Sequence, residues 1–298
     1  MVTIEEYLEE VLYDFKKYIK RKPCLCDLKS VNFNSGLIPD YSIIPIQQLY
    51  LLRYAFAYAF EYKRMYLSLL DRKNFPNEIS VLSLGCGTIV DYWSLLQALI
   101  ETGQRKCVVT YVGSDLIDWE YKFLARKKDN VWLYQQNGAD WVNESPSLGF
   151  DVYMFPKSIS EFSHRDFEII CENFQNKEIT KDNFHLLISL RVDQFSMERD
   201  ISRTSQLMSA IQRNGYHTED RYNVFTSFKD ETKGIRYYDG DFVFPDDAIE
   251  IIKILNQSCK NYIDNGENCD TDCATLLTRW PVLKPTTIRY QIISFERG

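Results

Sequence analysis

The sequence predicts an α/β fold in which a doubly wound, mostly parallel sheet carries helices on both faces. Three observations support this fold class. Between about residues 79 and 215, short apolar runs of strand length alternate with stretches of helical periodicity. The first four runs each end in glycine, proline or polar turn residues. The chain has 298 residues, of which 45% are hydrophobic, so it can bury a large core.

The residues before the first strand predict helices. Thr3 and Glu6 form a capping-box pair, and apolar residues then recur at helical spacing to about Lys20. Residues 46–70 contain no glycine or proline and are rich in Ala, Leu and Tyr, which predicts a long helix. We therefore expect residues 1–75 to form an N-terminal helical extension or lid, and residues 76–298 to form the α/β domain.

Five strands with helices between them are expected in the α/β domain. The strands are predicted at 79–84, 107–112, 131–135, 150–155 and 184–190, and the helices at 90–99, 119–126, 165–174 and in a stretch that ends near Gly215. Right-handed crossovers between parallel strands then place helices on both faces of the sheet. The alternation fails after Gly215, where strands at 222–228 and 286–295 flank an insertion at about 229–285 that contains a helix near 246–255.

Composition and charge exclude several classes of protein. The 35 basic and 42 acidic residues give a net charge of −7, so we expect no bulk nucleic acid partner. No apolar run reaches the length of a membrane span, and the first residues lack the pattern of a signal peptide, so no membrane partner is expected. The eight cysteines are scattered, which favours reduced thiols and a cytoplasmic location. A zinc site made of Cys24, Cys26, Cys259, Cys269 and Cys273 is the less favoured alternative, so we expect no metal.

A glycine turn follows the first strand directly. Gly85, Cys86 and Gly87 let the backbone approach a ligand closely, and the next helix presents free N–H groups there. Dinucleotide enzymes use the pattern G-x-G-x-x-G at this place. Val90 occupies the position of the third glycine, and this weakens the interpretation as a nicotinamide-dependent enzyme.

Four segments, VLSLGCGT, YVGSDL, QNGADW and FDVYMFPKS, stand at successive strand ends. This series resembles the class I S-adenosylmethionine-dependent methyltransferases over about residues 79–190, and the two later strands would complete that family's seven-stranded sheet. The resemblance implies S-adenosylmethionine as the cofactor. It implies a turn against the methionine part of the cofactor, an acid on the ribose hydroxyls and an Asp beside an apolar residue at the adenine. The implied cofactor-binding residues are Gly85, Cys86, Gly87, Thr88, Asp91, Asp115, Leu116, Asp140, Trp141, Phe155 and Pro156.

Two positions depart from the family pattern. Ser83 stands where many members have an acidic residue, and Ile89 stands in place of a further glycine. Asp91, in the first turn of the following helix, is the residue that could supply the missing carboxylate. The loop after the fourth strand also lacks the Asn/Asp-Pro-Pro-Tyr tetrad of adenine and glutamine amide N-methyltransferases, which disfavours that substrate class.

Three residues are candidates for the acceptor side of the reaction. Lys157 would fix an anionic acceptor, or is an exposed loop lysine, and Glu161 would be a general base, or caps the next helix. Tyr58 belongs to a ladder of tyrosines at every fourth residue from Tyr50 to Tyr66, which either packs in the core or lines an acceptor pocket.

The predicted function is methyl transfer to a small molecule or protein. A catalytically inactive methyltransferase-like module is one alternative, and a nicotinamide-dependent oxidoreductase is the second.

Overall fold

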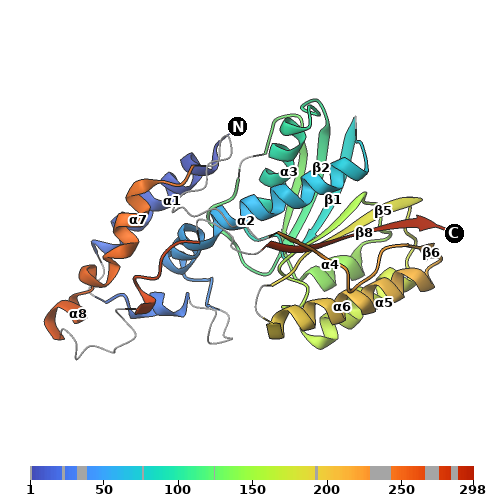
Figure 1. Ribbon diagram of the computed structural model, residues 1–298. Coiled ribbons are helices and arrows are strands. Elements are labelled where there is room, and N and C mark those ends of the chain that lie inside the picture. The colour runs from blue at the N-terminus through green and yellow to red at the C-terminus, as the bar shows by residue number, and fades with distance from the viewer. Residues whose placement is uncertain are drawn as a thin grey trace. The chain divides into compact units, whose positions relative to one another are not determined.

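The computed structural model divides the chain into two compact units (Figure 1). The helical unit comprises Met1–Phe60, Trp119–Leu124 and Thr232–Pro285, and the sheet unit comprises Glu61–Asp118, Ala125–Glu231 and Thr286–Gly298. The structure describes residues 2–21, 24–31, 39–75, 77–123, 125–191, 194–228, 243–265, 275–282 and 288–298.

The helical unit begins with α1 (Ile4–Ile19), whose start is fixed by the predicted capping box. The Thr3 hydroxyl accepts from the Glu6 N–H at 3.1 Å, and the Glu6 carboxylate accepts from the Thr3 N–H at 2.8 Å. One face of α1 is buried, and its Tyr7 ring stacks on Phe123 with centroids 4.0 Å apart. The predicted first helix is therefore confirmed. The other described elements of this unit are η1 (Cys26–Ser30), α7 (Asp246–Lys253), η3 (Leu255–Ser258) and α8 (Lys260–Asn265).

The long helix α2 (Ile44–Arg72) confirms the second prediction, and it contributes its first part to the helical unit. Its Arg53 is 1% exposed and donates to the carbonyl oxygens of Val31, Leu276 and Leu277 at 2.7–2.9 Å. Burial lowers the pKa of Arg53 to about 10. One guanidinium thus ties α2 to two segments that are distant in sequence.

The sheet follows the order β3-β2-β1-β4-β5-β8-β6. The first five strands pair in parallel, and β8 is antiparallel to β5. This confirms the predicted seven-stranded, mostly parallel sheet, and a short eighth strand, β7, pairs with the start of β8. The strands are β1 (Glu78–Leu84), β2 (Val108–Asp115), β3 (Asn130–Gln135), β4 (Val152–Pro156), β5 (Asn183–Ser189), β6 (Tyr216–His217), β7 (Thr226–Phe228) and β8 (Ile288–Arg297).

Helices cover both faces of the central strands. They are α3 (Val90–Glu101), α4 (Gly138–Glu144), α5 (His164–Asn176) and α6 (Gln194–Arg213). Val112 of β2 belongs to the core that α4, α5 and α6 cover, and α5 lies beside α6 (Figure 1). Its neighbour Tyr111 points to the opposite face, where its ring meets Tyr92 of α3 at 5.3 Å. Successive residues of a strand face opposite sides, so this pair shows the doubly wound arrangement.

The predicted helix at residues 119–126 is wrong. Residues 119–123 and 125–126 are irregular, and Trp119–Leu124 belongs to the helical unit. Alternate aromatic side chains at Trp119, Tyr121 and Phe123 are buried there, and the Tyr7 hydroxyl donates to the Tyr121 carbonyl oxygen at 3.1 Å. Tertiary packing of these side chains overrides local helical propensity.

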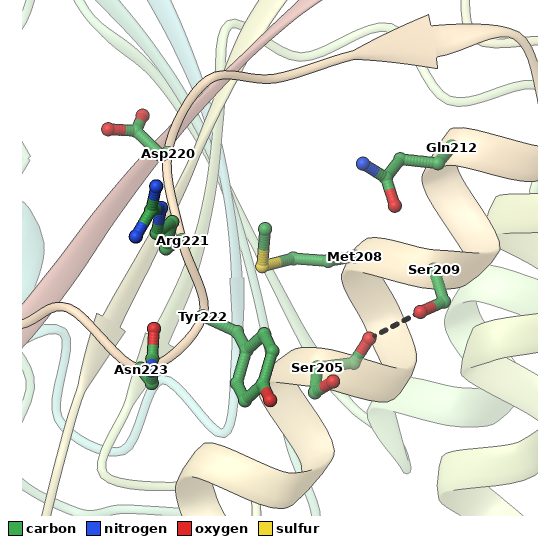
Figure 2. A pocket seen from close by; sticks show the side chains of 8 residues that line it. All are labelled: Ser205, Met208, Ser209, Gln212, Asp220, Arg221, Tyr222 and Asn223. Carbon is green, nitrogen blue, oxygen red and sulfur yellow. Dashed lines mark hydrogen bonds between the residues drawn. The ribbon is translucent and has the colours of Figure 1, made fainter.

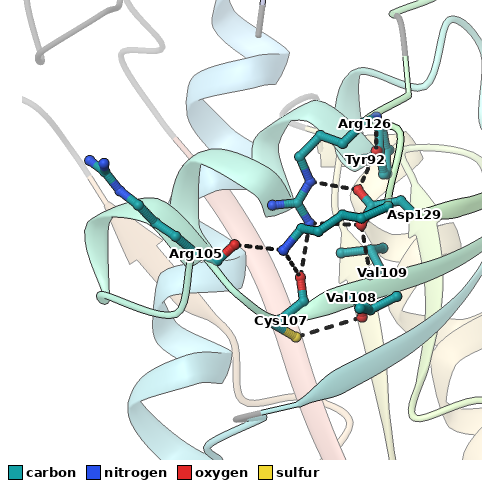
Figure 3. A network of polar contacts seen from close by, with 8 residues as sticks. Tyr92, Arg105, Cys107, Val108, Val109, Arg126 and Asp129 are labelled. Carbon is teal, nitrogen blue, oxygen red and sulfur yellow. Dashed lines mark hydrogen bonds and ion pairs between the residues drawn. The ribbon is translucent and has the colours of Figure 1, made fainter.

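A polar network fixes the chain where it returns to the sheet (Figure 3). Asp129 accepts from the Val109 N–H at 3.0 Å, the Tyr92 hydroxyl at 2.6 Å and the Arg126 guanidinium at 2.6 and 2.9 Å. Arg126 also donates to the carbonyl oxygen of Cys107 at 3.1 Å. These bonds fasten the segment before β3 to the beginning of β2.

Three further differences from the sequence prediction are local. Residues 138–144 form α4, where only a turn was expected, and the expected strand at 222–228 is reduced to β7. The sheet was expected to be covered on both faces throughout, but all residues of β3 except Val131 are exposed. Of the expected strand at 286–295, residues 286 and 287 lie outside the described part.

Candidate functional site

The glycine turn after β1 is held by the end of β2. The N–H groups of Gly85 and Cys86 both donate to the Ser114 carbonyl oxygen, at 2.8 and 3.1 Å. Gly85 and Gly87 have φ of 78° and 53°, which glycine adopts without strain. Ile89 also has a positive φ, 56°, which is strained for a β-branched residue. The turn therefore keeps a left-handed residue at the place where the family pattern has its third glycine.

Gly85 faces protein. A Cβ at this position would lie 2.5 Å from the Cβ of Ser158, whose hydroxyl donates to the Leu84 carbonyl oxygen. A larger residue at Gly85 would therefore collide with the loop after β4. The close approach that this glycine permits is between two strand-end loops of the same sheet.

Asp115, the last residue of β2, accepts hydrogen bonds from the same turn and from the residues that follow β2. One carboxylate oxygen accepts from the Gly87 N–H at 2.8 Å, and the other accepts from the Ile117 N–H at 2.8 Å. A carboxylate offers about four acceptor sites, so Asp115 can hold the turn and still accept from hydroxyl groups of a ligand. The next side chain, Leu116, is 65% exposed. A fixed carboxylate beside an exposed apolar side chain suits a nucleoside, which has hydroxyl groups and a flat apolar face.

The third strand end leads into α4. The Asn137 side chain accepts from the Ala139 N–H at 2.9 Å and caps this helix. Asp140 is exposed in the first turn, and the Trp141 ring packs near Tyr134 and Phe150 at 6.2 and 5.9 Å. Asp140 therefore lies on the surface at the start of α4, and its contact with a ligand stays a prediction.

Lys157 and Glu61 form a mostly buried ion pair in the loop after β4. The Lys157 ammonium lies 2.8 Å from a carboxylate oxygen of Glu61 and donates to the Leu190 carbonyl oxygen at 3.0 Å. Glu61 is 2% exposed and also accepts from the Ser189 hydroxyl. The charge expected to fix an anionic acceptor is therefore balanced by the protein itself. Lys157 has φ of 60°, and the pair holds its backbone in this left-handed conformation.

The rest of this loop is bound on several sides. Arg203 donates to the Ile159 carbonyl oxygen at 2.7 Å, and the Ser160 hydroxyl donates to Asp200 of α6. Arg191 donates its backbone N–H to Asp200 at 2.8 Å and its guanidinium to Ser160. The loop is therefore positioned by the residue that follows β5 and by side chains of α6.

Glu161 is the exposed carboxylate of this fastened loop. Its carboxylate makes no hydrogen bond and no ion pair with any residue that the structure describes. Desolvation by the surrounding protein, aided by the negative charges of Asp115 and Asp200, raises the pKa of Glu161 to about 7 against the opposing effect of Arg191. Solvent access and desolvation together describe a carboxyl group that is crowded by protein atoms and still reached by water. A group of this kind can exchange a proton with a ligand near neutral pH.

Two predicted cofactor residues lie in the interior. The Phe155 side chain is part of the core. Asp91 is 1% exposed, and its carboxylate accepts from the Tyr111 hydroxyl at 2.8 and 3.0 Å. Burial raises the pKa of Asp91 to about 6. The partner of Asp91 in the structure is therefore a side chain of β2.

The other predicted cofactor residues lie at the strand ends. Cys86 and Thr88 are buried in the turn, and Pro156 is half-buried at the end of β4. The structure thus brings the turn, Asp115, Leu116 and the β4 loop together at the carboxyl ends of the parallel strands.

Tyr58 belongs to an aromatic cluster of the helical unit. Its ring stacks on Tyr54 with centroids 6.0 Å apart, and Tyr50 lies near Tyr54, Tyr58 and Trp119 at 5.5–6.2 Å. This supports the packing interpretation of the tyrosine ladder. A role of Tyr58 toward an acceptor stays a prediction.

Sequence reasoning missed Glu61, Arg191 and Asp200. Glu61 interrupts an apolar helix, and this is the one signal that could have marked it as a buried, paired charge. Arg191 and Asp200 follow β5 and meet the β4 loop only in the folded chain.

A surface hollow of about 430 Å³ lies elsewhere in the sheet unit (Figure 2). It is lined by α6 side chains such as Met208 and Gln212 and by residues 220–223 after β6. None of the predicted site residues lines it.

Among the residues that the structure describes, no group of three or more His, Cys, Asp or Glu side chains could hold a metal ion. Cys269 and Cys273 of the alternative zinc site lie outside the described residues. None of the described helices combines the length and apolarity needed to cross a bilayer.

The chain is similar to known proteins in its structure but not in its sequence. Neither a family model nor a curated protein matches the chain. Among solved structures, the chain is similar to a loganic acid methyltransferase with SAH at 8% identity, covering 88% of this chain and 98% of that one, with a TM-score of 0.40. It is also similar to a plantazolicin methyltransferase in complex with SAH at 12% identity, covering 97% and 100%, with a TM-score of 0.42. A SAM-dependent methyltransferase from Archaeoglobus fulgidus has 15% identity, coverage of 79% and 94%, and a TM-score of 0.36. At these values the fold assignment depends on the sheet order and strand directions of the chain itself.

Proposed function

We propose that the chain is an S-adenosylmethionine-dependent methyltransferase that acts on a small molecule or a protein. The observation that carries the proposal is the clasp of Asp115 on the Gly87 N–H. It joins the glycine turn after β1 to the carboxylate after β2, at the edge of a parallel sheet where ligands bind in open α/β folds. The exposed side chain of Leu116 beside it supports a nucleoside at the same place.

Each strand end would hold a different part of the cofactor. The turn from Gly85 to Thr88 would lie against its amino acid part, and Asp115 would accept from its ribose hydroxyl groups. Leu116, Asp140 and Trp141 would surround its base. When bound, the cofactor supplies a methyl group on a sulfonium, which is already activated for transfer by its positive charge.

Glu161 is the residue that we assign to the acceptor. The fastened β4 loop holds its carboxylate without a described partner, so it can orient a hydroxyl or amine group and take the proton that the group loses. The ion pair with Glu61 makes Lys157 a positioning residue for this loop. Asp115, Glu161 and Asp200 are all acidic, so an acceptor that carries a proton suits this site better than a carboxylate does.

Ligand binding tests the proposal directly. Isothermal titration calorimetry would compare S-adenosylmethionine, S-adenosylhomocysteine, NAD and NADP on the full chain. We expect the two adenosyl-amino-acid ligands to bind and the two nicotinamide ligands not to bind. Binding of NAD or NADP alone would overturn the proposal and favour an oxidoreductase.

A second measurement separates an enzyme from an inactive module. The ion pair that balances Lys157 favours the alternative of a module that binds the cofactor without transferring its methyl group. Labelled methyl transfer from S-adenosylmethionine into a cell extract distinguishes the two. Incorporation that Glu161→Gln removes would support the enzyme, whereas cofactor binding without incorporation would support the module. The expected cytoplasmic location rests on the cysteine pattern and stays a prediction.

A further inference from the structure

The side chains of the edge strand β3 are largely exposed to solvent. It is the outermost strand of the sheet, and among the described strands it pairs with β2 alone. Trp132, Leu133 and Tyr134 are 48%, 38% and 44% exposed. Three successive large apolar side chains point alternately to the two faces of a sheet, so both faces are uncovered here.

The segment between β2 and β3 explains why no crossover helix covers β3. In a doubly wound sheet, the crossover from β2 to β3 normally provides a helix that covers the edge strand. Here Trp119–Leu124 belongs to the helical unit and forms no helix in its described residues. Within the described residues of the sheet unit, α4 reaches this edge through the contact of Trp141 with Tyr134.

The strand also lacks the usual protection against pairing with another strand. Its sequence, NVWLYQ, contains no charged residue and no proline. Natural edge strands are protected by such residues, by bulges or by a covering element, because their unpaired N–H and C=O groups accept another strand readily. The hydrogen bonds of Asp129 to the Val109 N–H and to Arg126 fasten the segment before β3 to β2.

We propose that β3 is the interface of a homodimer, in which β3 of a second copy pairs with it antiparallel across a twofold axis. A register centred on Leu133 would place Trp132 opposite Tyr134 of the second copy on one face, twice by symmetry, and Leu133 opposite Leu133 on the other face. Directly opposed residues of antiparallel strands share a face, so this register buries all three exposed side chains.

The charges at the two ends of β3 complement each other in this arrangement. Exposed Lys127 and Lys128 precede the strand, and exposed Asp140 and Glu144 follow it in α4. Antiparallel pairing brings the basic end of one copy beside the acidic end of the other, whereas a parallel arrangement would bring like charges together. The charge pattern therefore favours a second copy over an unrelated strand.

Sedimentation velocity across a concentration series tests the proposal on the full chain. We expect the wild type to form a dimer, and Trp132→Lys to raise the dimer dissociation constant at least about tenfold, because it removes both cross-strand aromatic pairs. Phe195→Lys is the matched control, because it changes an aromatic side chain that is 79% exposed at the start of α6 and should leave the dimer unchanged. Circular dichroism would establish that the variants are folded.

A charge exchange tests the antiparallel orientation. Lys127→Glu and Glu144→Lys should each weaken their own homodimer, and an equal mixture of the two should form a heterodimer in native mass spectrometry, because opposite charges then meet at both ends. A wild type that stays monomeric at every concentration would overturn the proposal. A dimer that Trp132→Lys leaves intact would also overturn it, because the interface would then lie elsewhere.

Discussion

Removal of the Asp115 carboxylate tests both the glycine turn and the proposed cofactor site. Its two oxygens each accept one backbone N–H at 2.8 Å. A hydrogen bond to a charged group contributes about 1.5–3 kcal/mol, and the half-buried setting of Asp115 favours the low end. We expect Asp115→Ala to lower the free energy of unfolding by about 2 kcal/mol and to weaken S-adenosylhomocysteine binding by about 1–3 kcal/mol, which is roughly 5- to 150-fold.

Asp115→Asn refines this expectation. The amide keeps one acceptor oxygen, but its NH₂ group would face the second N–H donor, so we expect losses between those of the wild type and of Asp115→Ala. Urea unfolding measures the stability, and calorimetry measures the affinity. Glu172→Ala, which removes the same charge from an exposed position of α5, is the control.

The outcomes distinguish the two roles of Asp115. If Asp115→Ala keeps the stability and the affinity of the wild type, the reasoning about the turn is refuted. If the stability falls and the affinity is unchanged, Asp115 is a structural residue and the ribose contact is refuted. If the wild type does not bind S-adenosylhomocysteine, the proposed function fails independently of the turn.

Three further predictions concern the buried and exposed charges. Glu61→Leu should lower the free energy of unfolding by about 3–5 kcal/mol, because it leaves the mostly buried Lys157 ammonium without its carboxylate. Adding Lys157→Met to this variant should recover most of the loss, as urea unfolding would show. An equal loss in the single and the double variant would contradict the role of the ion pair. The folded pKa of Asp91, about 6, lies above the ordinary value of 3.8, so the folded state binds this proton more tightly and stability should fall as pH rises from about 4 to 6. Asp91→Asn keeps an acceptor for Tyr111 and should reduce that fall by on the order of 1–3 kcal/mol in urea unfolding at pH 4 and 7, whereas an unchanged fall would assign it to other groups. Glu161→Gln should weaken the binding of sinefungin, an S-adenosylmethionine analogue with an amine in place of the methyl group, about tenfold more than it weakens that of S-adenosylhomocysteine; equal effects would place Glu161 away from the methyl position.

Much of the fold could be predicted because periodicity reports burial locally. The strand at 79–84 and the capping box at Thr3 depend on neighbours in sequence, and both agree with the structure. The helix expected at 119–126 failed because its aromatic residues contact α1 and α2, which are distant in sequence. Local sequence does not show which distant surface a side chain will cover.

Part of the candidate site could also be predicted from the sequence, and part depends on contacts between distant segments. The succession of strand ends in the sequence predicts Asp115 beside the glycine turn, because parallel strands bring their carboxyl ends to one edge. The partner of Lys157 could not be predicted, because Glu61 precedes it by 96 residues and meets it only in the folded chain. The predicted ligand role of Lys157 depended on an unpaired charge, and the structure supplies the pair.

The sequence by itself determined where the five parallel strands lie, where the glycine turn falls and which carboxylates stand at the strand ends, because these depend on periodicity and on local backbone conformation. Only the tertiary structure decided that Glu61 balances the charge of Lys157, that Glu161 has no hydrogen-bond or ion-pair partner among the described residues, and that the side chains of β3 are exposed. Each of these depends on pairing or packing between segments far apart in the chain, and the free energy of such contacts is set by the folded geometry.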